Sequence, residues 1–137
     1  MKALVTGGAG FAGSHLTEWL LGLGWETTVL AAEQEDLGNI RHLLGDVRLL
    51  RGDLRNAEGI ANQVRGCAPD HVFHLAALSS PSESMRNPAL TYEVNFLGTL
   101  NLLLACRQLG KDLPSRSIFH IPADRLPCNH TWGATSQ

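Results

Sequence analysis

Three glycines near the start of the chain form the group with the clearest chemical potential. Gly7, Gly10 and Gly13 stand three residues apart, directly after the apolar run Lys2–Thr6 and before an amphipathic pattern. Gly7 would let the chain turn sharply off a strand. Gly10 would let a pyrophosphate approach the backbone, and Gly13 would let a helix lie against the strand. Unpaired N–H groups at the helix start favour an anion. The pattern therefore predicts a dinucleotide site, although glycines at this spacing also serve ordinary turns.

The elements that must position this turn are predicted from the apolar pattern along the chain. Five short strands are expected, and helices are expected after the first, third and fourth of them. The strands cover residues 2–6, 25–31, 47–51, 71–76 and 117–121, and the helices cover 11–22, 56–64 and 88–109, with a short helix at 37–44 and a loop at 78–87. This alternation predicts an α/β fold, a Rossmann-type doubly wound parallel sheet with strand order 3-2-1-4-5.

Two of these helices carry apolar residues at helical spacing, which indicates the side that faces the sheet. On the first helix these residues are Phe11, Leu16, Leu20 and Leu23. The longest helix has Asn87 as a good N-cap and Pro88 at its first position. Its apolar positions are Leu90, Val94, Leu97, Leu100 and Leu104.

Length and composition fit one domain with a real core. The chain has 137 residues, of which 44% are hydrophobic, and a net charge of −2 that gives no reason to expect nucleic acid or membrane. Its start is a strand that runs into glycines, which predicts no signal peptide. The three cysteines are scattered, which favours reduced thiols in the cytoplasm. No set of metal-ligating residues is predicted, since His71 and His74 would point to opposite faces of a strand.

Four stretches together carry a family resemblance. They are Thr6–Leu16, Gly52–Leu54, Val72–Ala77 and Asn95–Leu103. In this order and spacing they resemble the extended short-chain dehydrogenase/reductases, the NAD-dependent epimerase/dehydratase family. Residues 74–80 and 95–103 are most similar to the branch of GDP-mannose 4,6-dehydratase and GDP-4-keto-6-deoxymannose reductase. The resemblance covers residues 2–121, so residues 1–121 are expected to be an NAD(P)-binding Rossmann domain and residues 122–137 an irregular tail.

The resemblance implies a role for individual residues. The three glycines with Phe11 and Ala12 would hold the cofactor pyrophosphate, and Ala31 would end the strand beside the cofactor. Asp53 would accept a hydrogen bond from the adenine amine, with Leu54 beside it, although Gly52-Asp53 also reads as a plain turn. The remaining implied contacts are Ala76 and Ala77 at the nicotinamide, Asn95 in the network behind the site, and Ser79 and Ser80 either beside a sugar nucleotide or as ordinary loop serines.

The choice between NAD and NADP stays open from the sequence. An acidic residue about 20 positions after the glycines would bind the ribose 2′-hydroxyl of NAD, and an arginine would favour NADP. The second strand ends in Ala31-Ala32, which is neither. Glu33, Glu35 and Asp36 follow, but a solvated acidic loop explains them equally well. The branch that the chain resembles uses NADP, yet no arginine occurs before Arg41.

The catalytic residues of the family have no counterpart in this sequence. The family uses a Tyr-x-x-x-Lys pair as its general acid/base, but Tyr92, the one tyrosine, is followed at that spacing by Phe96. Residues 121–124 stand where the family carries serines. We therefore expect a truncated, inactive portion of an enzyme for nucleotide sugars, with its family homodimer disturbed. A non-catalytic dinucleotide-binding or partner-binding module, or an unstable remnant, is the alternative.

Overall fold

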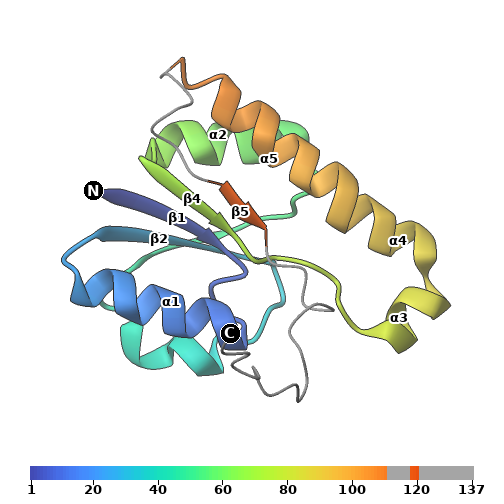
Figure 1. Ribbon diagram of the computed structural model, residues 1–137, viewed down its shortest axis with the longest axis horizontal. Coiled ribbons are helices and arrows are strands. Elements are labelled where there is room, and N and C mark those ends of the chain that lie inside the picture. The colour runs from blue at the N-terminus through green and yellow to red at the C-terminus, as the bar shows by residue number, and fades with distance from the viewer. Residues whose placement is uncertain (111–117, 121–137) are drawn as a thin grey trace, which may run out of the picture.

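The computed structural model describes residues 1–110 and 118–120. Its centre is a parallel sheet of five strands in the order β3-β2-β1-β4-β5, as predicted (Figure 1). The strands are β1 (Lys2–Thr6), β2 (Glu26–Ala31), β3 (Arg48–Arg51), β4 (His71–His74) and β5 (Ile118–His120). Because all strands run the same way, their carboxyl ends meet at one edge. Residues 122–137 lie outside the described residues, so the domain boundary at 121 stays a prediction.

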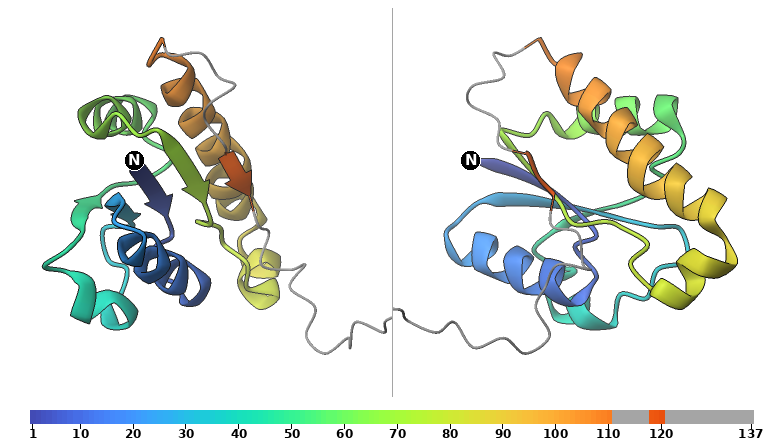
Figure 2. Two further views of the ribbon diagram at one scale, coloured as in Figure 1. Left: turned by 60° about the vertical axis from the view of Figure 1, so that its left-hand side comes forward. Right: turned by 45° about the vertical axis from the view of Figure 1, so that its right-hand side comes forward.

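Helices cover both faces of the sheet, which confirms the doubly wound architecture (Figure 2). On one face, α1 (Phe11–Gly22) and the 3₁₀ helix η1 (Gly38–Leu43) pack on Ala3, Val5 and Val29. On the other face, α2 (Ala57–Cys67) and α5 (Gly98–Arg107) pack on Leu4, Leu30 and Val72. Neighbouring residues of β1 thus serve opposite layers, as the alternation of side chains along a strand requires.

The apolar side predicted for α1 is only partly correct. Leu20 is fully buried, and Leu16 packs against the core. Phe11, however, is 77% exposed and Leu23 is 53% exposed. Phe11 lies in the first turn of α1, beyond the carboxyl end of β1, and Leu23 lies at the C-cap. The sheet therefore reaches only the middle of the helix, and the two ends extend past it.

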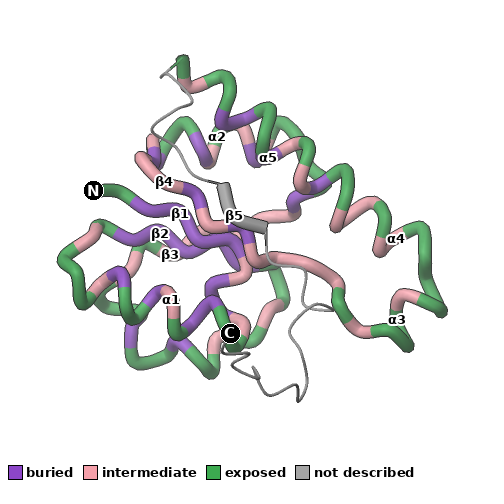
Figure 3. The backbone as a smooth tube through the Cα atoms, in the orientation of Figure 1, coloured by how far each residue is buried: buried purple, intermediate pink, exposed green. Residues whose placement is uncertain are grey.

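The long helix buries a different side from the one predicted. It runs through α4 (Pro88–Tyr92), the π-helical turn η2 (Glu93–Leu97) and α5, and the predicted positions Leu97, Leu100 and Leu104 are about 40% exposed. The buried positions instead are Gly98, Leu102, Ala105 and Cys106. A π turn holds one residue more than an α turn, so it moves the buried side one position along the chain. Figure 3 shows the outer side of this helix as largely exposed.

Among the described residues, the helix Pro88–Arg107 is long and apolar enough to cross a membrane by length and composition alone. The core helix of a water-soluble domain passes the same test. Here Leu102, Ala105 and Cys106 pack with α2 and the sheet in one hydrophobic cluster. One side of this helix therefore belongs to the core, while the apolar side chains on its other side are exposed.

The segment 78–87, expected to be a loop, contains the short helix α3 (Pro81–Arg86). The Ser80 side chain caps it by accepting a hydrogen bond from the Glu83 N–H at 3.4 Å. Pro81 follows at the first helical position. Serine, proline and an acidic residue three positions after the serine form a helix-start signature, which the loop prediction overlooked.

Candidate functional site

The glycine turn has the backbone geometry that the sequence predicts. Gly7 has a φ of +69°, and a Cβ there would lie 2.7 Å from the Ala76 nitrogen. A Cβ at Gly13 would lie 2.1 Å from the Gly7 oxygen, whereas a Cβ at Gly10 would meet only that oxygen, at 3.3 Å. Gly7 and Gly13 are therefore required by packing. Gly10 leaves open space beside the turn, which a ligand could fill.

Gly8 is a residue of this turn that the sequence reading missed. A Cβ there would lie 2.8 Å from Cγ1 of Val29, on the neighbouring strand β2. The adjacent Ala9 is buried, and its carbonyl oxygen accepts a hydrogen bond from Nδ2 of Asn39 on η1 at 3.0 Å. Val29 of β2 and Asn39 of η1 therefore hold the turn in place. Two consecutive glycines were the signal that could have identified Gly8.

The start of α1 leaves main-chain donors open. Its N-cap residue is Gly10, with no side-chain cap, and its first turn holds no acidic residue. The Ser14 hydroxyl donates to the Phe11 oxygen instead of capping the helix. Unpaired N–H groups and the helix dipole favour an anion at such an end. Phe11 and Ala12 are both exposed beside this end.

A carboxylate from the loop that follows β2 lies at the carboxyl end of this strand. The predicted cofactor residue Ala31 is 1% exposed and packs with Ala9 and Ile40. Oε2 of Glu35 accepts a hydrogen bond from the Ala32 N–H at 2.9 Å. Nη1 of Arg51, from β3, donates to the main-chain oxygens of Ala32 at 2.5 Å and Glu35 at 2.9 Å. A turn held by Arg51 thus returns the Glu35 carboxylate to the end of β2.

The turn after β3 holds a closed ion pair. Both carboxylate oxygens of Asp53 accept from the Arg55 guanidinium, at 2.6–3.0 Å, and Oδ1 also accepts from the Arg55 main-chain N–H at 2.9 Å. These hydrogen bonds hold the pKa of Asp53 below its usual value. Because a carboxylate has about four acceptor positions, Asp53 can accept from adenine only by giving up a bond to Arg55. Its predicted adenine contact stays a prediction.

Leu54, beside Asp53, is fixed by the long helix. It is 8% exposed, and a Cβ at Gly98 would lie 2.8 Å from the Leu54 Cβ. Nδ2 of Asn101 donates to the Leu54 oxygen at 2.9 Å. The sequence had linked Leu54 to the cofactor, but its side chain belongs to the core cluster formed by α2 and α5. The predicted cofactor contact of Leu54 stays a prediction.

The loop after β4 is held by Asn95, from the π turn. Oδ1 of Asn95 accepts from the Leu78 N–H at 2.8 Å, and Nδ2 donates to the Leu78 oxygen at 2.9 Å. Ala76 and Ala77, the predicted nicotinamide contacts, precede this pair and are partly buried. Asn95 therefore holds the main chain of this loop at Leu78, and its place in the support network that the resemblance implies stays a prediction.

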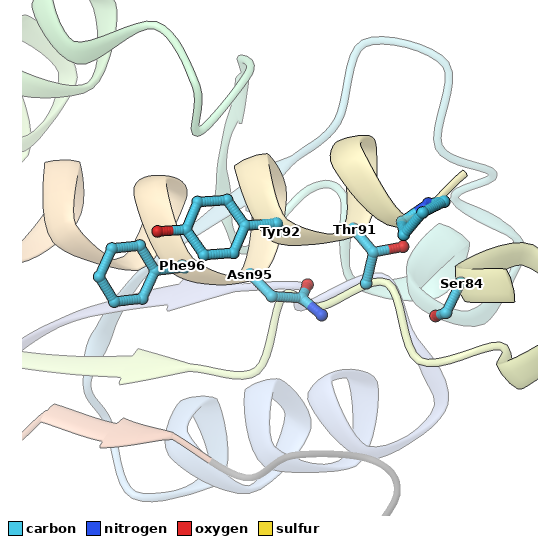
Figure 4. Close-up of a pocket in the computed structure, with 6 residues that line it drawn as sticks. Ser84, Thr91, Tyr92, Asn95 and Phe96 are labelled. Carbon is cyan, nitrogen blue, oxygen red and sulfur yellow. The ribbon is translucent and has the colours of Figure 1, made fainter.

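Asn95 also lines an open cavity of about 440 Å³ (Figure 4). The rings of Tyr92 and Phe96 stack at its rim with centroids 5.0 Å apart. Its lining residues are Ser84, Pro88, Thr91, Tyr92, Asn95 and Phe96. Ser79 and Ser80, the predicted substrate contacts, are not among them. Ser80 caps α3, and Ser79 is exposed.

Comparison with known proteins identifies relatives of this chain. Residues 4–124 match the family described as GDP-mannose 4,6 dehydratase. UDP-glucuronic acid decarboxylase 1 from Danio rerio is 35% identical over 126 residues, which are 90% of this chain and 28% of that protein. The crystal structure of Thermus thermophilus UDP-glucose 4-epimerase in complex with NAD is 48% identical, with a TM-score of 0.72, and the match covers 80% of this chain and 35% of that one.

A second solved structure is similar to the same degree in shape. UDP-glucose 4-epimerase from Stenotrophomonas maltophila, with bound NAD and formylated UDP-arabinopyranose, has a TM-score of 0.72 and 30% identity. The match covers 80% of this chain and 34% of that one. This chain thus spans about a third of the length of these relatives.

The strand order and the glycine turn at the head of α1 define the class of Rossmann-type dinucleotide-binding folds. Within that class, the chain belongs to the NAD-dependent epimerase/dehydratase family, in which its match is to GDP-mannose 4,6 dehydratase.

Proposed function

We propose that the chain is the NAD(P)-binding portion of a sugar-nucleotide dehydratase, epimerase or reductase. The observation that carries the proposal is the glycine turn leading into an uncapped, acid-free start of α1. Relatives of similar fold hold NAD. Titration calorimetry of the purified chain with NADH is expected to show one saturable site of micromolar affinity. No heat of binding with NADH, NADPH or ADP-ribose would contradict the proposal.

The chain by itself is proposed not to turn over substrate. The sequence contains one tyrosine, Tyr92, and no Tyr-x-x-x-Lys pair to act as general acid/base. Tyr92 stacks on Phe96 at the rim of the cavity. Absorbance of the reduced nicotinamide is expected to stay constant with NAD or NADPH and GDP-, UDP-, CDP- or dTDP-sugars. A steady change in that absorbance would contradict this part of the proposal.

The cofactor is proposed to be NAD rather than NADP. Glu35 holds its carboxylate at the end of β2, where the family site has the adenosine ribose. Glu33 and Asp36 add negative charge nearby, and Nη1 of Arg51 is bound to two carbonyl oxygens. A carboxylate accepts a hydrogen bond from a ribose hydroxyl, whereas it repels a 2′-phosphate.

The variant Glu35→Gln tests this preference. The wild-type chain is expected to bind NADH about tenfold tighter than NADPH, and Glu35→Gln is expected to remove most of that ratio, a change of about 1.4 kcal/mol. Glu33→Gln removes the same charge from an exposed neighbour and serves as the control. If the ratio is reversed in the wild type and Arg51→Gln abolishes NADPH binding, Arg51 rather than Glu35 selects the cofactor.

The nucleotide sugar of the complete enzyme is proposed to lie along the segment 76–80. Ser79 is exposed there, and Asn95 fixes the backbone at Leu78. One relative holds a UDP-sugar together with NAD.

A weakened homodimer is proposed to form through the outer side of α4 and α5. Phe96, Leu100 and Leu104 are 41–54% exposed on this helix, and Tyr92, Leu97 and Leu103 are exposed beside them. Apolar side chains gathered on one exposed helix favour a partner. Light scattering is expected to show a mass that rises with micromolar concentration.

The matched variants for this surface are Leu100→Glu and Leu23→Glu. Leu100→Glu is expected to give a monomer at every concentration, because a charge in an apolar contact loses hydration without gaining a partner. Leu23 is exposed at the end of α1, on the opposite face of the sheet, so Leu23→Glu should not change the mass. A monomeric wild type would contradict the proposed dimer without affecting the proposed cofactor site.

A non-catalytic module that senses a dinucleotide or joins a partner chain is the second candidate. The observation that favours it is an intact glycine turn in a chain without the catalytic pair. Binding of NADH by a stable monomer, with no turnover, would support this candidate.

The proposed compartment is the cytoplasm. Burial raises the pKa of the Cys67 thiol, which keeps it protonated inside the core.

A further inference from the structure

His74, the last residue of β4, is fully buried and is bonded at both ring nitrogens. Nδ1 lies 2.6 Å from Oγ1 of Thr6, at the end of β1. Nε2 lies 2.8 Å from Oγ1 of Thr99, on α5. The ring therefore spans from the centre of the sheet to the helix layer. Burial makes a charged ring costly, and a neutral ring can bond to both threonine hydroxyls.

The direction of these hydrogen bonds follows from the Thr99 hydroxyl. Its one hydrogen is donated to the main-chain oxygen of Asn95 at 2.6 Å. Towards His74 the Thr99 oxygen can therefore only accept, so Nε2 carries the ring hydrogen. Nδ1 then accepts from the Thr6 hydroxyl, and the Thr6 oxygen accepts from the Ala76 N–H at 3.4 Å. Every donor in the series points the same way.

Both ends of this series lie at the segment 75–80, and Thr6 within it lies at the glycine turn; these are the two walls of the proposed dinucleotide site. Thr6 directly precedes Gly7, and the series begins at Ala76, against whose nitrogen Gly7 packs. It ends at Asn95, whose side chain holds Leu78. Hydrogen bonds that share donors and acceptors in one direction strengthen one another. The main-chain bond from the Leu75 N–H to the Thr6 oxygen, at 3.1 Å, joins the same two segments, so a change at any side chain of the series is expected to loosen their contact rather than break it.

We propose that His74, as the neutral Nε2–H tautomer, is the positioning residue that sets the distance between the glycine turn and the segment 75–80. The proposal rests on the proposed cofactor site. A buried histidine that only stabilised the core would affect folding but would leave dinucleotide affinity, in the folded protein, unchanged. The two roles are therefore separable by experiment.

The first measurement is the nitrogen NMR spectrum of the imidazole in the full chain without cofactor. For His74 it is expected to show a protonated Nε2 and an unprotonated Nδ1. A protonated Nδ1, or both nitrogens protonated at neutral pH, would overturn the proposal. This readout needs no ligand, so it stands apart from the test of the proposed function.

The second measurement compares Thr99→Val with Thr99→Ser. Valine keeps the shape but removes the hydroxyl, and serine restores it. Thr99→Val is expected to weaken NADH binding about tenfold, to speed hydrogen exchange at the Ala76 and Leu78 amides, and to change the tautomer signal of His74. Thr99→Ser should match the wild type in all three readouts.

Thr27→Val is the matched control for losing a threonine hydroxyl. Thr27 is buried in β2, and its hydroxyl donates to the Trp25 oxygen, outside the series. If Thr99→Val folds and binds NADH like the wild type, or if Thr27→Val weakens binding as much, the proposal is overturned. If Thr99→Val does not fold, the tautomer of the wild type and the behaviour of Thr99→Ser decide. Absence of binding in the wild type would refute the cofactor site instead.

Discussion

The variant Gly13→Ala is expected to lose dinucleotide binding almost completely. A Cβ at this position would lie 2.1 Å from the Gly7 oxygen and 2.7 Å from the Gly8 Cα. Both are backbone atoms, so no side chain can rotate away, and α1 must move off the glycine turn. Overpacking of this kind costs about 1–3 kcal/mol of folding free energy. The same movement displaces the open N–H groups from the pyrophosphate, so the affinity should fall about a hundredfold, or about 2.8 kcal/mol.

The measurement is NADH calorimetry with circular dichroism and urea unfolding on the same samples. Gly22→Ala is the control, because a Cβ at Gly22, the last residue of the same helix, meets nothing within 4 Å. Alanine is the better helix former by about 1 kcal/mol, so this control should be no less stable than the wild type. A folded Gly13→Ala chain that binds NADH within threefold of the wild type, inside about 0.7 kcal/mol, would show that the close approach of α1 is not needed.

The glycine turn could be predicted from the sequence because its requirement is local. A strand end, a positive φ and a helix start occupy consecutive residues, so the types and spacing of residues 6–13 carry the geometry. The sheet order is not local, but the alternation of strands and helices with the right-handed crossover rule and the glycine motif predicted it. The helix N-cap at Asn87 was equally local, and its side chain accepts the expected hydrogen bond. Asn56 caps α2 in the same way.

The contacts that the sequence could not supply come from residues far apart in the chain. Arg51, at the end of β3, donates to the main chain just after the neighbouring strand β2, and this contact fixes the turn that carries the Glu35 carboxylate. His74 joins Thr6 and Thr99 only because β1 and α5 pack on either side of it. Neither of these contacts produces a periodic pattern in the sequence from which it could be predicted. The π turn at 93–97 likewise shifts the buried side of the long helix, and the regular apolar spacing gave no sign of it.

The half-buried side-chain amide of Asn95 joins the long helix to the loop after β4. Asn95 is the second site where a single atom should have a large effect, and Asn95→Asp changes one NH₂ group to an oxygen. At neutral pH the new carboxylate would still accept from the Leu78 N–H, but it would face the Leu78 oxygen, to which Nδ2 now donates at 2.9 Å. Two acceptors in contact, with a lost donor, should destabilise the fold by about 2 kcal/mol.

This destabilisation should depend on pH with a definite sign. Only the protonated acid can donate to the Leu78 oxygen, so the folded state raises the pKa of the introduced carboxyl above its ordinary value of about 3.9. The penalty is therefore complete above the folded pKa, shrinks as the pH falls below it, and is gone below the unfolded value of about 3.9. Urea unfolding of Asn95→Asp and the wild type should converge between neutral pH and about pH 4, while NADH affinity recovers in parallel.

Asn62→Asp is the control for this change. Oδ1 of Asn62 accepts from the Arg65 guanidinium at 3.1 Å on the exposed side of α2, so a carboxylate keeps that contact and gains charge attraction. Its stability relative to the wild type should not improve on acidification. If Asn95→Asp is as stable as the wild type at pH 7, or if its deficit is the same at both pH values, the hydrogen bonds to Leu78 do not hold the loop. The π turn would then influence the predicted cofactor segment 76–80 only through side-chain packing.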